Sequence, residues 1–120
     1  MTVRVTTVTE PRRVDLSANE PVSHDPGVLD READVAGTRW ALVEYSSGAG
    51  RDGWCDTPHA GYVLSGTVVY RFDDGRDPLI LGAGDAFALP ATPRHRGSND
   101  GPEPARLFII DALPGVDTAC

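Results

Sequence analysis

The sequence contains no lysine, only two cysteines and no long hydrophobic run among its 120 residues. A membrane-spanning helix needs a run of about 18 or more apolar residues, so a transmembrane helix is excluded. Two cysteines, Cys55 and Cys120, do not make the disulfide framework of a small secreted domain, although a bond between them stays open. We expect Cys120 to lie on a loose tail.

Positive charge is also scarce. All 11 basic residues are arginine, the formal net charge is −7 and the pI is about 4.7. Binding to nucleic acid or to an anionic membrane surface normally needs a basic face, so both partners are disfavoured. The N-terminal residues show no apolar stretch with a cleavage-like site, and we therefore expect a soluble cytoplasmic protein.

The length suits one domain with a real core. We expect an N-terminal strand and irregular arm over residues 1–37, a barrel over 38–113 and a flexible tail over 114–120. Within the first part, residues 2–8 alternate like an edge strand. Prolines interrupt residues 9–36, which we interpret as an irregular arm with one helical turn near Val28–Val35. Its length suggests packing across the barrel or onto a second subunit.

Strand patterns recur at short intervals after Thr38, and glycine-rich turns separate them. The expected strands lie near residues 38–45, 60–65, 67–72, 78–81, 86–90 and 105–111. Many short strands without helical periodicity are typical of an all-β sandwich or barrel.

One stretch carries a specific motif. From Gly84 the sequence continues through Pro90 and His95 to Asn99, and this spacing resembles the second motif of the cupin family. The departure is Thr92, where the family usually has glycine. The resemblance covers roughly residues 38–111.

The upstream stretch from His59 to Gly66 resembles the end of the first cupin motif. His59 holds the position at which the family usually has a glutamate. The two histidines that normally precede that glutamate are absent. Their places are taken by Gly53 and Cys55 with the shorter family spacing, or by Asp52 and Trp54 with the longer one.

The resemblance implies an all-β fold, the double-stranded β-helix or jelly-roll barrel, with the site inside the barrel mouth. It also implies a tendency to form homodimers. The family's site residues usually hold a divalent metal ion. His95 carries that role over directly, and His59 does so by substitution for glutamate.

Strand geometry supports part of this site. In an extended segment alternate side chains share a face, so Cys55 and His59 point the same way. Thiolate and imidazole are good ligands for zinc, and imidazole also suits iron. Together with His95 they make a three-ligand metal site of the open, catalytic kind, for which zinc or iron is expected. A carboxylate from Asp52 or Asp56 would shift the preference toward Fe(II) or Mn²⁺.

Each of these residues also has a plainer interpretation. His59 can be a hydrogen-bonded pocket histidine without metal, and Cys55 can be a small buried hydrophobe. Asn99 fits a turn better than a catalytic role. Arg94 and Arg96 flank His95 and should face away from it.

Other polar groups are candidates for acid–base chemistry. Glu44 lies among the apolar residues of one expected strand face, where the pKa of a carboxyl can rise. It is therefore a candidate catalytic residue beside His95 and His59. The three tyrosines, Tyr45, Tyr62 and Tyr70, are first of all packing residues, and the alternative is that one of them donates a proton to a substrate.

Three functions follow from these patterns. The first is a metal-dependent enzyme that acts on a small organic molecule. The second is a metal-free isomerase, epimerase or cyclase in which a histidine moves a proton. The third is a non-catalytic module that binds or senses a small ligand. The sequence does not identify the substrate, because a fold hosts many functions.

Overall fold

The computed structural model describes residues 3–5 and 7–112. Apart from one 3-10 helix, η1 (Leu16–Ala18), its regular structure is β: β1 (Val3–Val5), β2 (Val22–Asp25), β3 (Val28–Val35), β4 (Thr38–Tyr45), β5 (His59–Ser65), β6 (Thr67–Phe72), β7 (Leu79–Gly82), β8 (Ala86–Leu89), β9 (His95–Ser98) and β10 (Ala105–Ala112). The all-β prediction is confirmed. The tail expected over 114–120, including Cys120, lies outside the described residues.

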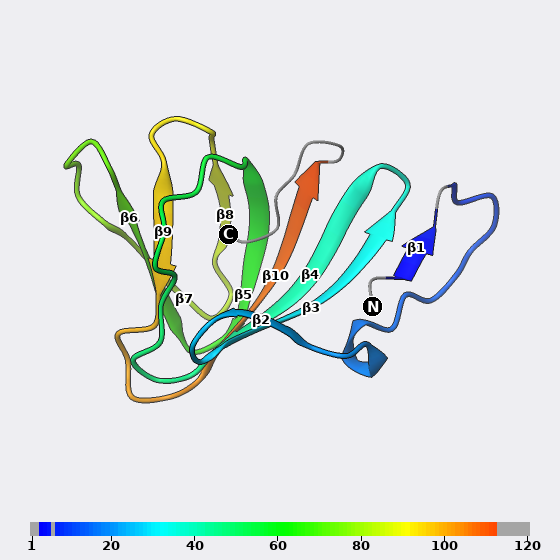
Figure 1. Ribbon diagram of the computed structural model, residues 1–120, viewed down its shortest axis with the longest axis horizontal. Coiled ribbons are helices and arrows are strands. Elements are labelled where there is room, and N and C mark those ends of the chain that lie inside the picture. The colour runs from blue at the N-terminus through cyan, green and yellow to red at the C-terminus, as the bar shows by residue number, and fades with distance from the viewer. Residues whose placement is uncertain (1–2, 6, 113–120) are drawn as a thin grey trace.

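The strands form two sheets that enclose the core between them (Figure 1). The larger sheet has the order β1-β3-β4-β10-β5-β8. β2 pairs with the first residues of β3, Val28 to Asp30. The smaller sheet has the order β7-β6-β9. β1 pairs with β3 in parallel, and the other described strand pairs are antiparallel. β1 lies at an edge of the larger sheet.

Alternation along the strands separates an inner face from an outer one. On β4 the inward side chains Ala41, Val43 and Tyr45 are buried, whereas Trp40, Leu42 and Glu44 on the opposite face are half-buried. The other core residues come from β5, β6, β7, β8 and β10 in the same way, and include Val63, Val68, Tyr70, Leu81, Phe87, Leu89 and Leu107. This period of two is what one buried face of a sheet requires.

The expected helical turn near Val28–Val35 is wrong, because these residues form β3. β3 pairs with β4 along its whole length, from Val28 opposite Tyr45 to Val35 opposite Thr38. The two strands are joined by Ala36 and Gly37, both with positive φ (48° and 81°), as a tight two-residue hairpin requires. The strand escaped detection because its inward positions include charged residues, which hide the usual apolar alternation.

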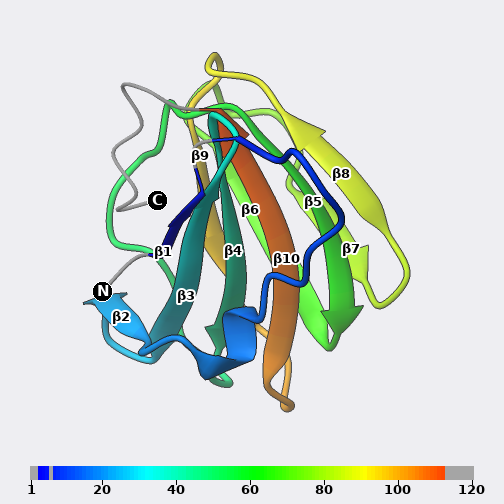
Figure 2. The same ribbon diagram turned by 90° about the vertical axis from the view of Figure 1, so that its right-hand side faces the viewer.

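The segment between β1 and β2 runs over the outer face of the larger sheet (Figure 2). Val14 and Leu16 pack there against Ala33, Val35 and Trp40. The arm therefore covers the outer side of β3 in its own chain. None of the described segments is a helix with the length and apolarity needed to cross a bilayer.

Candidate functional site

The segment before β5 runs beside β9 and brings Cys55 next to His95. The two residues form an isolated antiparallel bridge, with backbone N–O distances of 2.8 and 2.9 Å in the two directions. His95 is 1% exposed and Cys55 is 3% exposed. Direct pairing of their backbones therefore fixes two of the expected ligand residues on adjacent chain segments.

His59 opens β5 and lies in register with Asp111 of β10. Its Nδ1 is hydrogen-bonded to the Asp111 carboxylate, and its Nε2 lies 3.6 Å from Cys55 Sγ. A carboxylate accepts at Nδ1, so that nitrogen carries the proton and Nε2 presents a lone pair. Asp111 thus orients His59 so that its free nitrogen faces the other two residues.

The side chains of Cys55, His59 and His95 converge. Their candidate ligand atoms all lie within 4.8 Å of one another, and the two imidazole centroids are 4.8 Å apart. Neither ring nitrogen of His95 has a hydrogen-bond partner among the described residues, although both are buried. Buried polar atoms are normally satisfied, and a metal ion would satisfy one of these two nitrogens.

Burial also sets the charge state of His95. Its pKa falls from 6.5 to about 4, chiefly because burial disfavours the charged ring and secondly because His59 lies beside it. The imidazole is therefore neutral near pH 7, which is the form that binds a metal.

The sulfur of Cys55 has a further bond. Cys55 is disulfide-bonded in this structure. A sulfur in a disulfide is not a thiolate, and the thiolate is the form that binds metal. The nitrogen donors of His59 and His95 are therefore the part of the ligand set that does not depend on the state of Cys55.

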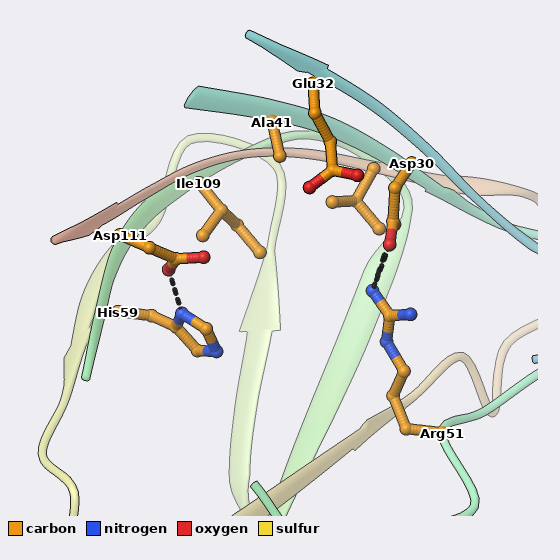
Figure 3. A pocket seen from close by; sticks show the side chains of 8 residues that line it. Asp30, Glu32, Ala41, Arg51, His59, Ile109 and Asp111 are labelled. Carbon is orange, nitrogen blue, oxygen red and sulfur yellow. Dashed lines mark hydrogen bonds and ion pairs between the residues drawn. The ribbon is translucent and has the colours of Figure 1, made fainter. Parts of the chain in front are cut away.

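A pocket opens beside His59 on the inner face of the larger sheet (Figure 3). Its cavity volume is about 10 Å³, which is room for about one water molecule. It is lined by Asp30, Glu32, Ala41, Val43, Arg51, His59, Ile109 and Asp111. The His59–Asp111 pair therefore belongs both to the cluster and to the pocket wall.

Arg51 forms the opposite side of this pocket and is 7% exposed. Its Nη2 donates to both Asp30 oxygens at 3.0 and 3.2 Å, and its Nη1 lies 3.5 Å from Asp25. Its Nε donates to the Tyr45 hydroxyl at 3.3 Å. Burial raises the pKa of Asp30, and Arg51 partly offsets this effect.

Glu32 points into the same pocket from β3 (Figure 3). Burial raises the pKa of the Glu32 carboxyl. Arg39, whose Nη1 lies 3.6 Å from Glu32 Oε2, partly offsets this rise. Sequence reasoning missed Asp30, Glu32, Arg51 and Asp111 as site residues. For Asp30 and Glu32 the sequence does contain an indication, because acidic residues alternate along 28–35. Their side chains share one face only if that segment is a strand.

The structure does not bring Glu44 to this site. It lies on the outer face of β4, and its carboxylate is 3.6 Å from Arg106 on β10. The interpretation of Glu44 as a catalytic acid or base therefore has no support in the geometry, because alternation along β4 turns it away from the pocket. Asp52 and Asp56, the alternative carboxylate ligands, are exposed.

Asn99 is buried and closes a turn, as its plainer interpretation suggested. Its Nδ2 donates to the carbonyl oxygens of Tyr45 and Glu103 at 3.2 and 2.7 Å. Of the two arginines beside His95, Arg94 pairs with Asp73, and the Arg96 guanidinium stacks 4.4 Å from the Trp54 ring centroid.

Comparison with known proteins agrees with this architecture. Residues 53–111 match the family model described as a cupin domain. No curated protein shows significant similarity to the sequence.

Several solved structures are similar in fold. The polyketide cyclase RemF from Streptomyces resistomycificus superposes with a TM-score of 0.73 at 16% identity, covering 88% of this chain and 81% of that one. A sugar phosphate isomerase from a cupin superfamily, from Silicibacter pomeroyi, gives 0.68 at 18% identity over 86% and 76%.

Oxalate decarboxylase of Bacillus subtilis, which has Mn(II) centres, gives a TM-score of 0.72 at 26% identity. The match covers 85% of this chain but 30% of that protein, so this chain spans less than a third of it. The double-sheet, jelly-roll fold expected from the sequence is confirmed by these neighbours and by the two sheets described above. The domain match over residues 53–111 and the shared fold together show that this chain belongs to the cupin superfamily.

Proposed function

We propose that this protein is a small metal-binding cupin enzyme that acts on a small organic molecule in the barrel pocket. The observation that carries the proposal is the buried His95, whose ring nitrogens have no hydrogen-bond partner in the described part of the chain. His95 faces His59, whose Nε2 is presented by Asp111. Two imidazoles fixed in this way suit zinc or iron, the ions expected from the sequence.

His59 and His95 would hold the ion, and Cys55 would join them as a thiolate when its sulfur is reduced. The bound ion would supply Lewis-acid polarisation of a substrate oxygen. Asp111 keeps the His59 proton on Nδ1, while Ala41, Val43 and Ile109 form the apolar part of the pocket wall. A cytoplasmic location belongs to the same proposal, because reduction of the Cys55 disulfide to the proposed thiolate needs the reducing conditions of the cytosol.

The test is the metal content of protein purified without added metal, measured by mass spectrometry with and without a reductant. We expect about one ion per chain in the wild type and a severe loss in His95→Ala, which removes a ligand. His24→Ala is the matched control, because His24 is exposed on β2 outside the cluster, and it should keep the metal. Wild-type protein that neither carries an ion nor binds added Zn²⁺ or Fe²⁺ would overturn the proposal.

A second candidate is a metal-free isomerase, epimerase or cyclase. It is favoured by the disulfide state of Cys55 and by the His59–Asp111 hydrogen bond, which orients an imidazole as a base needs. A cyclase and an isomerase are among the proteins of similar fold. Native mass spectrometry that finds a bound organic molecule and no metal would favour this candidate, or a non-catalytic binding module.

A further inference from the structure

The sulfur of Cys55 lies among the candidate ligand atoms and is also part of a disulfide. Cys55 is 3% exposed, and its Sγ lies 3.6 Å from Nε2 of His59. One ligand atom from each of Cys55, His59 and His95 lies within 4.8 Å of the other two. A disulfide sulfur does not carry the negative charge of a thiolate ligand, so the disulfide and a metal–sulfur bond exclude each other.

His95 gives an independent indication that this cluster takes an ion. It is 1% exposed, and neither of its ring nitrogens has a hydrogen-bond partner among the described residues. A buried polar atom costs free energy until something satisfies it. While Cys55 is in its disulfide, His59 and His95 offer two nitrogen donors. Once Cys55 is reduced, the cluster offers three donors, the number of an open zinc site.

Backbone hydrogen bonds hold Cys55 at the cluster independently of the disulfide. The Cys55 amide donates to the His95 carbonyl oxygen at 2.8 Å, and the His95 amide donates to the Cys55 carbonyl oxygen at 2.9 Å. The Thr57 amide donates to Cys55 Sγ at 3.3 Å. A donor that points at the sulfur stabilises negative charge there. The reduced residue therefore has both the position and the charge stabilisation that a metal ligand needs.

We infer that the Cys55 disulfide is a redox switch for the metal site. The oxidised protein binds the ion weakly through His59 and His95, and the reduced protein binds it tightly through all three residues. The inference rests on the proposed function in that the cluster binds a metal ion.

The reductant of this switch is a dithiol. One of its thiolates attacks the disulfide and expels Cys55 Sγ as a thiolate, which keeps the electron pair of the broken S–S bond. The second thiol of the reductant then displaces the other protein sulfur, which takes up the proton of that thiol. The reductant leaves as a disulfide, so two electrons have passed to the protein.

Oxidation and metal binding must influence each other in both directions. If reduction raises the affinity for Zn²⁺ by some factor, saturating Zn²⁺ favours the reduced protein over the disulfide form by the same factor. The site therefore fills under reducing conditions and loses its ion when the disulfide forms.

The test measures the Zn²⁺ affinity of metal-stripped protein in two redox states. One sample is oxidised with oxidised glutathione, and the other is reduced with dithiothreitol, which is then removed under nitrogen. Alkylation and mass spectrometry verify the state of Cys55, and both samples are titrated against a chromophoric chelator. We expect reduction to raise the affinity at least about 100-fold, because losing only an outer partner of a ligand costs about 10–100-fold.

The outcomes separate this inference from the proposal on which it rests. Equal Zn²⁺ affinities in the two redox states overturn the redox switch and leave the metal site standing. Absence of binding in both states overturns the two together. Cys55 that can still be alkylated after oxidation overturns the switch as well.

Cys55→Ser separates a sulfur ligand from a loss of constraint, because it removes the disulfide and the thiolate together. Its Zn²⁺ affinity should equal that of the oxidised wild type and should not respond to the reductant. His24→Ala is the matched control on the exposed part of β2 and should keep the full rise on reduction. Cys55→Ser that binds Zn²⁺ as tightly as the reduced wild type contradicts the ligand role of the sulfur.

A spectroscopic measurement decides the ligand role even if Cys55→Ser does not fold. Reduced wild type loaded with Co²⁺ should show a sulfur-to-cobalt charge-transfer band in the near ultraviolet, and the oxidised protein should lack it. Saturating Zn²⁺ should also shift the glutathione ratio at which half of Cys55 is oxidised, by the factor found in the titration. Reduced protein that binds Co²⁺ without this band overturns the inference.

Discussion

At the scale of single residues, the candidate site depends on Asp111, which is not one of the three candidate metal ligands but is hydrogen-bonded to one of them, His59. Among the described members of the cluster, Asp111 is hydrogen-bonded to His59 alone, yet it decides which ring nitrogen carries the proton. Such outer partners commonly orient metal-binding histidines. The sequence indicated His59, His95 and Cys55 by motif and alternation, but it gave no means of placing Asp111 opposite His59.

Asp111→Asn should weaken metal binding by about 10–100-fold, the usual effect of losing an outer partner of a ligand histidine. An asparagine can turn its NH₂ group toward Nδ1 and so favour the tautomer whose Nε2 carries the proton. The measurement is a competition titration of Zn²⁺ against a chromophoric chelator.

Asp100→Asn is the control for that titration, because Asp100 is an exposed carboxylate paired with Arg71. It should bind Zn²⁺ like the wild type. Equal affinity of Asp111→Asn and the wild type would show that Asp111 does not position His59.

At the scale of elements, the sequence predicted the strands with a regular apolar alternation. β4 and β6 have the expected bounds, and β5, β7, β8 and β10 differ by one residue at one or both ends. β3 was missed because Asp30 and Glu32 occupy its inward positions. β9 was missed because it is four residues long and contains Arg96, Gly97 and Ser98, which resemble a turn. Both strands carry polar site residues, and these residues interrupt the apolar alternation by which a strand is predicted.

Gly61 of β5 marks a close approach between elements. A Cβ atom there would lie 2.4 Å from Cζ of Phe87 and 2.9 Å from the carbonyl oxygen of Phe108. We expect Gly61→Ala to lower the free energy of unfolding by about 1–3 kcal/mol, as overpacking of a core does. Urea denaturation measures the change.

Gly82→Ala serves as the control for Gly61→Ala, because a Cβ atom at Gly82 meets nothing within 4 Å. It should alter stability by less than about 0.5 kcal/mol, like other changes at uncrowded surface sites. If Gly61→Ala proved as stable as Gly82→Ala, the packing of β5 against Phe87 would be looser than described.

At the scale of the whole molecule, the outer face of the larger sheet carries an apolar group beside its charged residues. Phe108 of β10 lies in register with Leu42 of β4 and Tyr62 of β5. The arm covers the β3 side of this face, whereas Tyr62 and Leu64 remain 44% and 45% exposed. Exposed apolar patches of this kind mark association surfaces, so the homodimer expected from the sequence stays a prediction with a definite location.

Light scattering at tens of micromolar should give the mass of a dimer for the wild type. Tyr62→Lys should shift the protein toward the monomer, because it buries a charge in the proposed interface. Ile80→Lys is the control, since Ile80 is an equally apolar residue that is 68% exposed on β7 of the smaller sheet. A wild-type monomer at this concentration, or equal dissociation by both variants, would rule out this surface.

The position of β10 has a consequence for how the protein is made. β10 lies between β4 and β5, which therefore become neighbours in the sheet only through residues 105–112. A chain emerging from the ribosome cannot close this sheet before those residues appear. The same strand brings Asp111 to His59, so a nascent chain acquires its barrel and its oriented histidine in one step. Folding should accordingly be slow for the chain length, as in other proteins built from pairings distant in sequence.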